Sequence, residues 1–244
     1  SPIVSGERVY FGSGDGNVYC LDAAAGTKLW EYAAGNAILS SPAVSGGKVY
    51  VGSNDNKLYC LNALDGTKIW EFETQEAVQS SPAVVDGYVY VGGMDDNVYC
   101  LNAETGEQVW SYTTQADVFS TPAVVDGKVY IGGVDFILYC LDAQTGELQW
   151  QFETEGDIPP SPAVANGRVY FGSKDNYFYC VDAETGQKLW DLQTGDIVFD
   201  SPAVYEGFVY FGSLDKKVYC LNAQTGALAW QFEASGLIQS SPAV

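Results

Sequence analysis

The chain has 244 residues, with 31 acidic and 11 basic side chains and a formal net charge of −20 at pH 7. A surface of this charge repels phosphate backbones and anionic lipid headgroups, so nucleic-acid and membrane-surface binding are disfavoured. The chain contains no His, which excludes a Ser-His-Asp triad and an imidazole metal site. It has no apolar run of 18 residues, so no membrane-spanning helix is expected. It begins without Met or a charged segment leading into an apolar stretch, so we expect a mature, trimmed or engineered chain.

One unit recurs along the whole chain. The chain opens with Ser1-Pro2-Ile3-Val4, and a Tyr-Cys pair begins at residues 19, 59, 99, 139, 179 and 219. Each pair leads into Ala-x-x-Gly-x-x-x-Trp, which ends at Trp30, Trp70, Trp110, Trp150, Trp190 and Trp230. A period of 40 residues without insertion or deletion indicates a repeat architecture.

The unit from residue 81 to residue 120 shows which elements each repeat contains. A first strand is predicted over 81–85, with Pro82 where the start of a strand tolerates proline. Asp86-Gly87 is a strong signal for a two-residue hairpin. Further strands are predicted over 88–93, 97–103 and 108–114, separated by turns. No segment has a helical period, so each unit is predicted to be a four-stranded antiparallel meander.

The middle strands of each unit are apolar on both faces, whereas a sheet with one wet face should alternate. Blades packed face to face in a β-propeller require such sheets. The fourth strand does alternate, as in Trp70-Glu71-Phe72-Glu73, which suits an exposed edge. A two-layer solenoid is the competing fold, but it needs atypical end units, and the first and sixth units are regular. We therefore predict an all-β, six-bladed β-propeller with four-stranded antiparallel blades and a 40-residue repeat.

The two ends of the chain carry the same strand. Ser241-Pro242-Ala243-Val244 is a seventh copy of the segment that opens the chain. We expect residues 1–244 to form a single propeller domain in which one of the two terminal copies is redundant or pairs outside the ring. The alternative is that the chain is a piece of a seven- or eight-bladed propeller.

The six cysteines occupy one position of the repeat. Equivalent residues of neighbouring blades in a six-fold ring lie roughly 15 Å apart, whereas a disulfide requires Cα atoms within about 7 Å. We therefore expect six free, buried thiols that behave as small hydrophobic residues.

The run from Asp182 to Trp190, preceded by Gly172-Ser173-Lys174-Asp175 and Tyr179, resembles the PQQ-like repeat. That family includes quinoprotein alcohol dehydrogenases and the outer-membrane assembly lipoprotein propellers. Its tryptophan-docking motif reads Ala-x-Asp-x-x-Thr-Gly-x-x-x-Trp. Here Cys replaces the Ala in every unit, Asn replaces the Asp in three units, and Ala25 and Asp65 replace the Thr. The resemblance covers the entire chain. It implies that each Trp docks on the neighbouring blade, and that the protein is extracytoplasmic, either periplasmic or at the cell surface.

Catalytic chemistry has little support in the sequence. The quinoprotein dehydrogenases that the chain resembles add adjacent cysteines, a calcium-binding set and a catalytic Asp, and this chain has neither adjacent cysteines nor insertions. No catalytic residue, cofactor or metal is therefore expected. An Asp recurs in the turn between the second and third strands of every repeat, at residues 15, 55, 95, 135, 175 and 215. We interpret it as a turn-closing residue, which bonds its own backbone, and not as part of a cation site, which would need converging carboxylates.

The positions at which the repeats disagree are the best indication of a binding site. In a propeller, the second-to-third-strand turns and the blade-to-blade linkers share one face. Large apolar residues occur there unexpectedly: Phe136, Ile137 and Tyr177 at the turns, and Phe119 and Phe199 in the linkers. Exposed apolar clusters and loops on a rigid scaffold often mark interaction sites. The alternative is that these side chains fold inward over the blade edges or fill the central channel.

These observations favour a non-enzymatic, monomeric scaffold that presents one face to a protein or peptide partner. A small-ligand or glycan binder that uses the channel mouth is the second hypothesis, and a quinone-dependent oxidoreductase is the third. The regular repeats are also compatible with engineering or recent amplification, without an evolved partner.

Overall fold

The computed structural model describes residues 1–243 and divides into two compact units, unit 1 over Ser1–Thr121 and unit 2 over Pro122–Val244. Each unit contains three four-stranded antiparallel sheets, and the described residues include no helix. The prediction of an all-β chain with six four-stranded propeller blades is confirmed. The single-domain organisation stays a prediction. Residues 1–243 contain no helix long and apolar enough to span a membrane.

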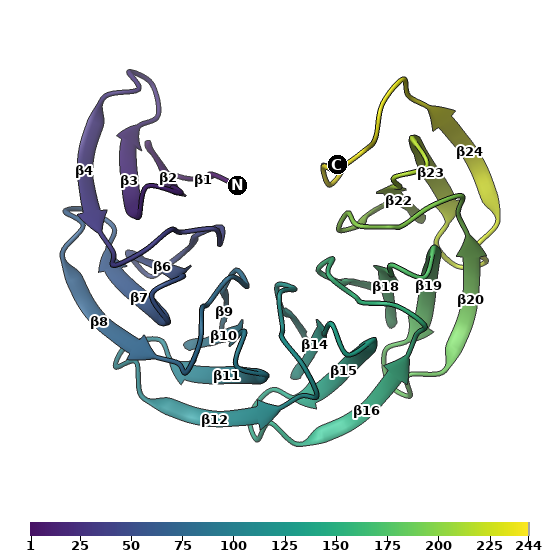
Figure 1. Ribbon diagram of the computed structural model, residues 1–244, viewed down its shortest axis with the longest axis horizontal. Coiled ribbons are helices and arrows are strands. Elements are labelled where there is room, and N and C mark those ends of the chain that lie inside the picture. The colour runs from purple at the N-terminus through teal and green to yellow at the C-terminus, as the bar shows by residue number, and fades with distance from the viewer. Residues whose placement is uncertain (244) are drawn as a thin grey trace. The chain divides into compact units, whose positions relative to one another are not determined.

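In unit 1, consecutive strands of each sheet lie side by side, as Figure 1 shows. The strands of its three sheets are β1 (Ile3–Ser5), β2 (Arg8–Gly12), β3 (Asn17–Asp22) and β4 (Lys28–Ala33); β5 (Ala43–Ser45), β6 (Lys48–Ser53), β7 (Lys57–Asn62) and β8 (Lys68–Glu73); β9 (Ala83–Val85), β10 (Tyr88–Gly92), β11 (Asn97–Asn102) and β12 (Gln108–Thr113).

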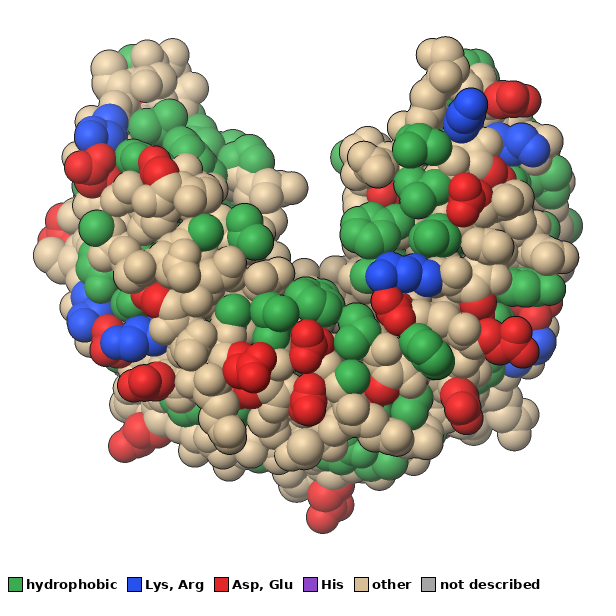
Figure 2. Space-filling model, viewed as in Figure 1, with side chains coloured by type: hydrophobic (Ala, Val, Ile, Leu, Met, Phe, Trp, Pro, Cys, Tyr) green, Lys and Arg blue, Asp and Glu red, His purple; other side chains and the backbone are tan. Residues whose placement is uncertain are grey.

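Unit 2 repeats this order. Its strands are β13 (Ala123–Val125), β14 (Lys128–Gly132), β15 (Ile137–Asp142) and β16 (Leu148–Glu153); β17 (Ala163–Ala165), β18 (Arg168–Gly172), β19 (Tyr177–Asp182) and β20 (Lys188–Gln193); β21 (Ala203–Tyr205), β22 (Phe208–Gly212), β23 (Lys217–Asn222) and β24 (Leu228–Glu233). Asp and Glu side chains are spread over the visible face of each unit, in keeping with the acidic composition (Figure 2).

The turn between the first two strands of a sheet is determined by its two central residues, as the third sheet shows. In the third sheet Asp86 and Gly87 both have positive φ, at 51° and 83°, and they connect β9 to β10 with Val85 opposite Tyr88. Positive φ at both central positions defines a type I′ turn, whose twist matches that of the strands. The strand begins at Ala83 and not at Ser81, because the preceding Pro82 has no N–H for the ladder.

The core lies between neighbouring sheets. The middle strands β10 and β11 are buried on both faces, whereas β12 alternates, with Trp110 buried between exposed neighbours. A bulge between Cys100 and Leu101 shifts the register of β11 against β12. The expectation of middle strands covered on both sides therefore holds in this sheet.

Tryptophan joins one sheet to the next inside each unit. Trp30 donates from its indole Nε1 to the carbonyl oxygen of Ala63, 3.1 Å away, and Tyr10 donates to the same oxygen. The indole lies over Gly66, where a Cβ atom would come within 2.6 Å of the ring and φ is 73°. Only Gly tolerates both the conformation and the approach. The same Trp–Ala hydrogen bond, at 3.1 to 3.3 Å, joins Trp70 to Ala103, Trp150 to Ala183 and Trp190 to Ala223. Trp230 differs, because it is 47% exposed.

The cysteines are free and buried, as predicted. Burial raises the pKa of Cys60, Cys100, Cys140 and Cys180 to about 12. The thiolate, which is the nucleophilic form, is therefore scarce at neutral pH, and these residues pack as apolar side chains.

Candidate functional site

The repeated turn Asp is a structural residue, as its hydrogen bonds in the fifth sheet show. Asp175 Oδ1 accepts from the backbone N–H of Tyr177 at 3.0 Å, which closes the turn. Its Oδ2 accepts from the Tyr179 hydroxyl at 2.8 Å and from the Glu155 backbone N–H at 3.0 Å. Glu155 belongs to the linker after the preceding sheet. Asp175 therefore closes its own turn and ties two sheets together.

The five residues predicted to bind a partner differ in exposure. Phe136 and Phe199 are 42% and 47% exposed, whereas Tyr177 and Phe119 are half-buried. Ile137 is buried, with 5% exposure, so the expectation of an exposed side chain is wrong for this residue. The physical reason is that β15 begins at Ile137, which therefore belongs to the strand and not to the turn tip. Phe119 lies in unit 1 and the other four lie in unit 2.

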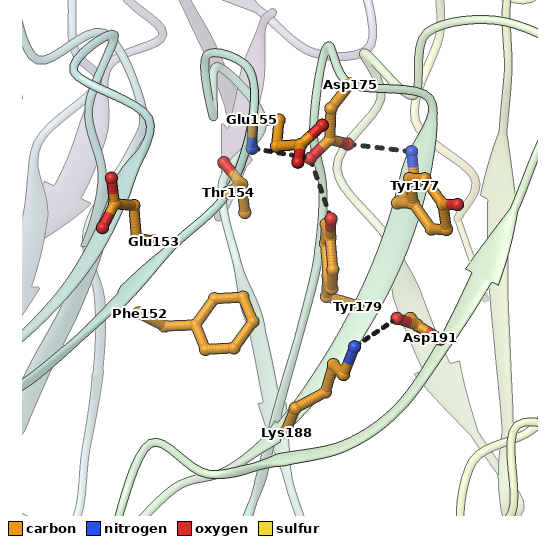
Figure 3. A pocket seen from close by; sticks show the side chains of 9 residues that line it. All are labelled: Phe152, Glu153, Thr154, Glu155, Asp175, Tyr177, Tyr179, Lys188 and Asp191. Carbon is orange, nitrogen blue, oxygen red and sulfur yellow. Dashed lines mark hydrogen bonds and ion pairs between the residues drawn. The ribbon is translucent and has the colours of Figure 1, made fainter.

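Tyr177 lines a groove in unit 2 between the outer strand β16 of one sheet and strands β19 and β20 of the next. We call this cavity, of about 530 Å³, the Tyr177 groove (Figure 3). It is lined by Phe152, Glu153, Thr154, Glu155, Asp175, Tyr177, Tyr179, Lys188 and Asp191.

Three aromatic rings form the apolar part of the groove. Tyr177 stacks on Tyr179 with ring centroids 5.8 Å apart, and Phe152 meets the same Tyr179 edge-on at 5.5 Å. Tyr179 is 8% exposed, and burial, followed by its hydrogen bond to Asp175, raises its pKa well above the ordinary value. Its hydroxyl is therefore neutral and fixed as a donor. Tyr177 and Phe152 remain half-buried, so their rings are available to a ligand.

Carboxylates dominate the polar part of the groove. Glu153, Glu155 and Asp191 are exposed at its rim. The one basic side chain in the lining, Lys188, forms an ion pair of 2.6 Å with Asp191. In Figure 3 Glu155 lies next to Asp175, whereas Glu153 lies on the opposite side of the view from Tyr177. The lining as a whole contains more carboxylates than basic groups. Aromatic faces combined with such charge attract a cation.

Other residues stand at the position of Tyr177 in the other sheets. In unit 1, Lys57 takes the place of Tyr177 and donates to Glu71 at 2.8 Å, so the carboxylate is neutralised within the sheet. In the third sheet, Asn97 holds this position and its side chain accepts from Thr113. Lys217 holds it in the last sheet. The combination of an aromatic ring with unpaired carboxylates therefore distinguishes the Tyr177 groove.

The structure brings Phe136 next to the groove but gives no such link for Phe199. The backbone oxygen of Phe136 accepts from the backbone N–H of Thr154 at 2.8 Å and from its hydroxyl at 2.9 Å. Because Thr154 lines the groove, these bonds hold the Phe136 turn next to it. Phe136 has a φ of 71°, so it occupies a turn conformation that bulky residues rarely adopt.

Sequence reasoning missed most of the lining. Phe152 and Glu153 have the same residues at the equivalent positions Phe72 and Glu73, and Lys188 and Asp191 resemble Lys68 and Glu71. Glu155 does differ from its counterparts, which are Gly, Gln or Ser. Tyr177 and Glu155 are therefore the departures from the repeat that the sequence could reveal in this lining, and only Tyr177 was singled out.

Comparison with known proteins places this geometry in a family. A family model described as outer membrane protein assembly factor BamB matches residues 1–82, 58–160 and 134–244. The solved structure of BamB from Moraxella catarrhalis is similar over 98% of this chain and 77% of its own, with 23% identity and a TM-score of 0.86. The computationally designed Ika8 protein is similar over 98% of this chain and 76% of its own, with 21% identity and a TM-score of 0.89. None of the curated proteins compared with the chain matches it.

Proposed function

The chain belongs to the family of the outer membrane protein assembly factor BamB, and from that premise we propose that it is a binding scaffold whose Tyr177 groove holds a basic side chain of a protein or peptide partner. The family description supports a role in protein assembly, and we propose the Tyr177 groove as the binding site. The same membership supports an extracytoplasmic location, which we propose for this chain.

One observation carries the proposal. Tyr177 presents a half-buried ring in a groove whose lining also includes Glu153 and Glu155, neither of which has a basic partner among the lining residues. An Arg or Lys of a partner would stack on the ring and be neutralised by the carboxylates. Aromatic anchors of this kind typically dominate the energy of an interface. The exposed Phe136, which adjoins the groove through Thr154, would contact the partner beyond that side chain.

The scaffold that we propose has no catalytic residue and no cofactor. The conspicuous repeated side chains have structural roles, as the hydrogen bonds of Asp175 and of Trp30 illustrate. A buried Cys with a pKa of about 12, such as Cys140, is a poor nucleophile.

A carbohydrate is the second candidate ligand, because of the pair of stacked rings. A sugar would pack on Tyr177 and donate hydroxyl hydrogens to Glu153 and Glu155. This ligand needs no positive charge, so its binding would be nearly independent of salt, whereas binding of a basic peptide would weaken as salt screens the carboxylates.

An array of immobilised peptides and an array of glycans, probed with the same labelled protein, test the proposal. We expect capture by peptides that contain Arg or Lys. Tyr177→Asn, which installs the residue found at positions 17 and 97, should weaken capture about tenfold. Tyr177→Phe retains the ring and should bind like the parent. Lys217→Asn, at the equivalent position of the last sheet, is the matched control and should change nothing.

Two results would count against the peptide proposal. One is a folded Tyr177→Asn protein that retains every peptide bound by the parent. The other is a signal on the glycan array without one on the peptide array, which would favour the carbohydrate.

A further inference from the structure

The last sheet of unit 2 exposes an apolar surface that its counterparts bury. Trp230 and Phe232 in β24 are 47% and 63% exposed, whereas Trp30 is 7% exposed. Tyr210 is half-buried, although the equivalent Tyr50 and Tyr170 are 2% and 1% exposed. We call the surface formed by Phe208, Tyr210, Trp230 and Phe232 the tail face.

The first sheet of unit 1 exposes the complementary surface. Ala23 and Gly26 are exposed, whereas the equivalent Ala63 is 6% exposed and packs under Trp30. Leu21 is half-buried, although Leu61 is fully buried. We call the surface formed by Phe11, Leu21, Ala23, Ala24 and Gly26 the head face.

The head and tail faces are the two halves of one interface that the chain already makes internally. Inside unit 1 the carbonyl oxygen of Ala63 accepts from Trp30 and Tyr10. The carbonyl of Ala23 occupies the same position of the repeat, and Trp230 and Tyr210 are the corresponding donors. Gly26 has a φ of 67° and has no atom within 4 Å of the place where a Cβ would be, so the space that an indole fills in the internal interfaces is open there.

A side-chain pair at the edge of the interface shows that these two faces are matched to each other. In the internal interfaces the first residue of this pair is basic, and in two of them the second is acidic. Lys48 pairs with Glu104 at 2.6 Å and Lys128 pairs with Glu184 at 2.7 Å. Arg8 and Arg168 instead donate to the backbone oxygens of Leu64 and Gln224. On the tail face the basic residue is replaced by Phe208, and on the head face the acidic one is replaced by Ala24. Both changes remove charge from the same pair.

We propose that the tail face binds the head face of a second copy of this chain. Each face is exposed on its own unit, and together the two faces carry the residues of an interface that is present inside both units. Because the two surfaces differ, the contact is heterologous, so each copy retains a free face with which it can bind another copy.

Sedimentation velocity over a range of protein concentrations tests the proposal. We expect the average mass of the parent protein to rise with concentration beyond that of a dimer. Trp230→Asp should inactivate the tail face and Gly26→Asn the head face, since Asn tolerates positive φ and its side chain fills the indole site. Each variant alone should remain a monomer. An equimolar mixture should form a dimer and nothing larger, because each copy retains one working face. Leu148→Asp, at an exposed position of β16, is the control and should associate like the parent.

A second pair of variants keeps the test decisive if the first pair folds poorly. Phe208→Lys and Ala24→Glu should each weaken association. Mixing the two should restore one parent contact between the unaltered faces and add a second, salt-sensitive contact between Lys and Glu, as for Lys48 and Glu104. A parent that remains a monomer at all concentrations, as the sequence led us to expect, would overturn the proposal. So would folded variants that form no dimer when mixed.

Discussion

At the scale of single residues, each recurring side chain makes the same contacts in most repeats. A residue that departs from the repeat loses these contacts, which affects stability. Ser40 shows the ordinary arrangement, because its hydroxyl donates to the Gly52 carbonyl at 2.8 Å and accepts from the Gly52 N–H at 2.9 Å. In the fifth repeat this position is Asp200, which is 3% exposed and has no hydrogen-bond partner at Oδ2. A buried carboxylate with an unsatisfied oxygen destabilises the fold.

Asp200 should make stability depend on pH. Burial raises its pKa, and the hydrogen bond from the Ser240 backbone N–H lowers it by less. Between the unfolded pKa of about 3.9 and the higher folded pKa, the folded chain binds more protons, so the contribution of Asp200 to stability falls as pH rises. Asp200→Ser removes the unsatisfied buried oxygen, so it should stabilise the protein at pH 7 by about 1–3 kcal/mol. The gain should be smaller below a pH of about 4, where the carboxyl group is protonated in both states. Urea unfolding of both proteins across pH measures the difference. A pH-independent difference would contradict the assignment.

The buried cysteines give a second prediction at this scale. A thiol reagent at pH 8 should react slowly with the native protein, for two reasons. The pKa is about 12 at Cys60, Cys100, Cys140 and Cys180. Burial also blocks access of the reagent to the thiols. In denaturant the same reagent should count six thiols at once. Rapid reaction of the native protein, or fewer than six thiols, would refute the description of a buried, reduced set.

At the scale of the sheets, tryptophan docking explains how one blade is held to the next. Trp70 hydrogen-bonds to Ala103 and lies over Gly106, with 8% exposure, whereas Trp230 holds the same position of the motif at 47% exposure. The two residues hold the same position in the fourth strand of their sheets, so the difference between them reports mainly the contribution of docking.

Trp70→Ala should cost on the order of 3–5 kcal/mol, the usual range for removing a large buried aromatic residue. Trp230→Ala should cost about 1 kcal/mol or less, since exposed positions contribute little. Chemical unfolding at low protein concentration, where copies are separate, measures both. Equal costs would show that the motif stabilises its own sheet and not the contact between sheets.

The strands could be predicted from the sequence because their signals are local. Pro82 and the Asp86-Gly87 turn fixed the limits of the strands to within two residues in the third sheet. Ile137 was misplaced by one residue, because a turn and a strand start look alike where the neighbouring Phe136 is also apolar. Of the Tyr177 groove, only Tyr177 was predicted as a site residue. Its other residues, such as Phe152, come from the neighbouring sheet and acquire their role by packing.

At the scale of the whole molecule, the net charge of −20 governs long-range behaviour. Self-repulsion destabilises a compact acidic protein, and salt screens it. We expect the melting temperature to rise by a few degrees, roughly 1 kcal/mol of stability, between low and physiological ionic strength, as measured by calorimetry. A melting temperature that falls with salt would show that the few ion pairs, such as Lys57 with Glu71, outweigh the repulsion.

The central claim is that Tyr177 and its carboxylates hold a basic side chain of a partner, and a double-mutant cycle by calorimetric titration tests it most directly. A peptide selected on the array would be titrated with its Arg intact or replaced by Gln, against the parent protein and Tyr177→Leu. We predict a coupling energy of about 1 kcal/mol or more between Tyr177 and the Arg. Additive effects of the two changes, with a coupling energy near zero, would contradict the claim.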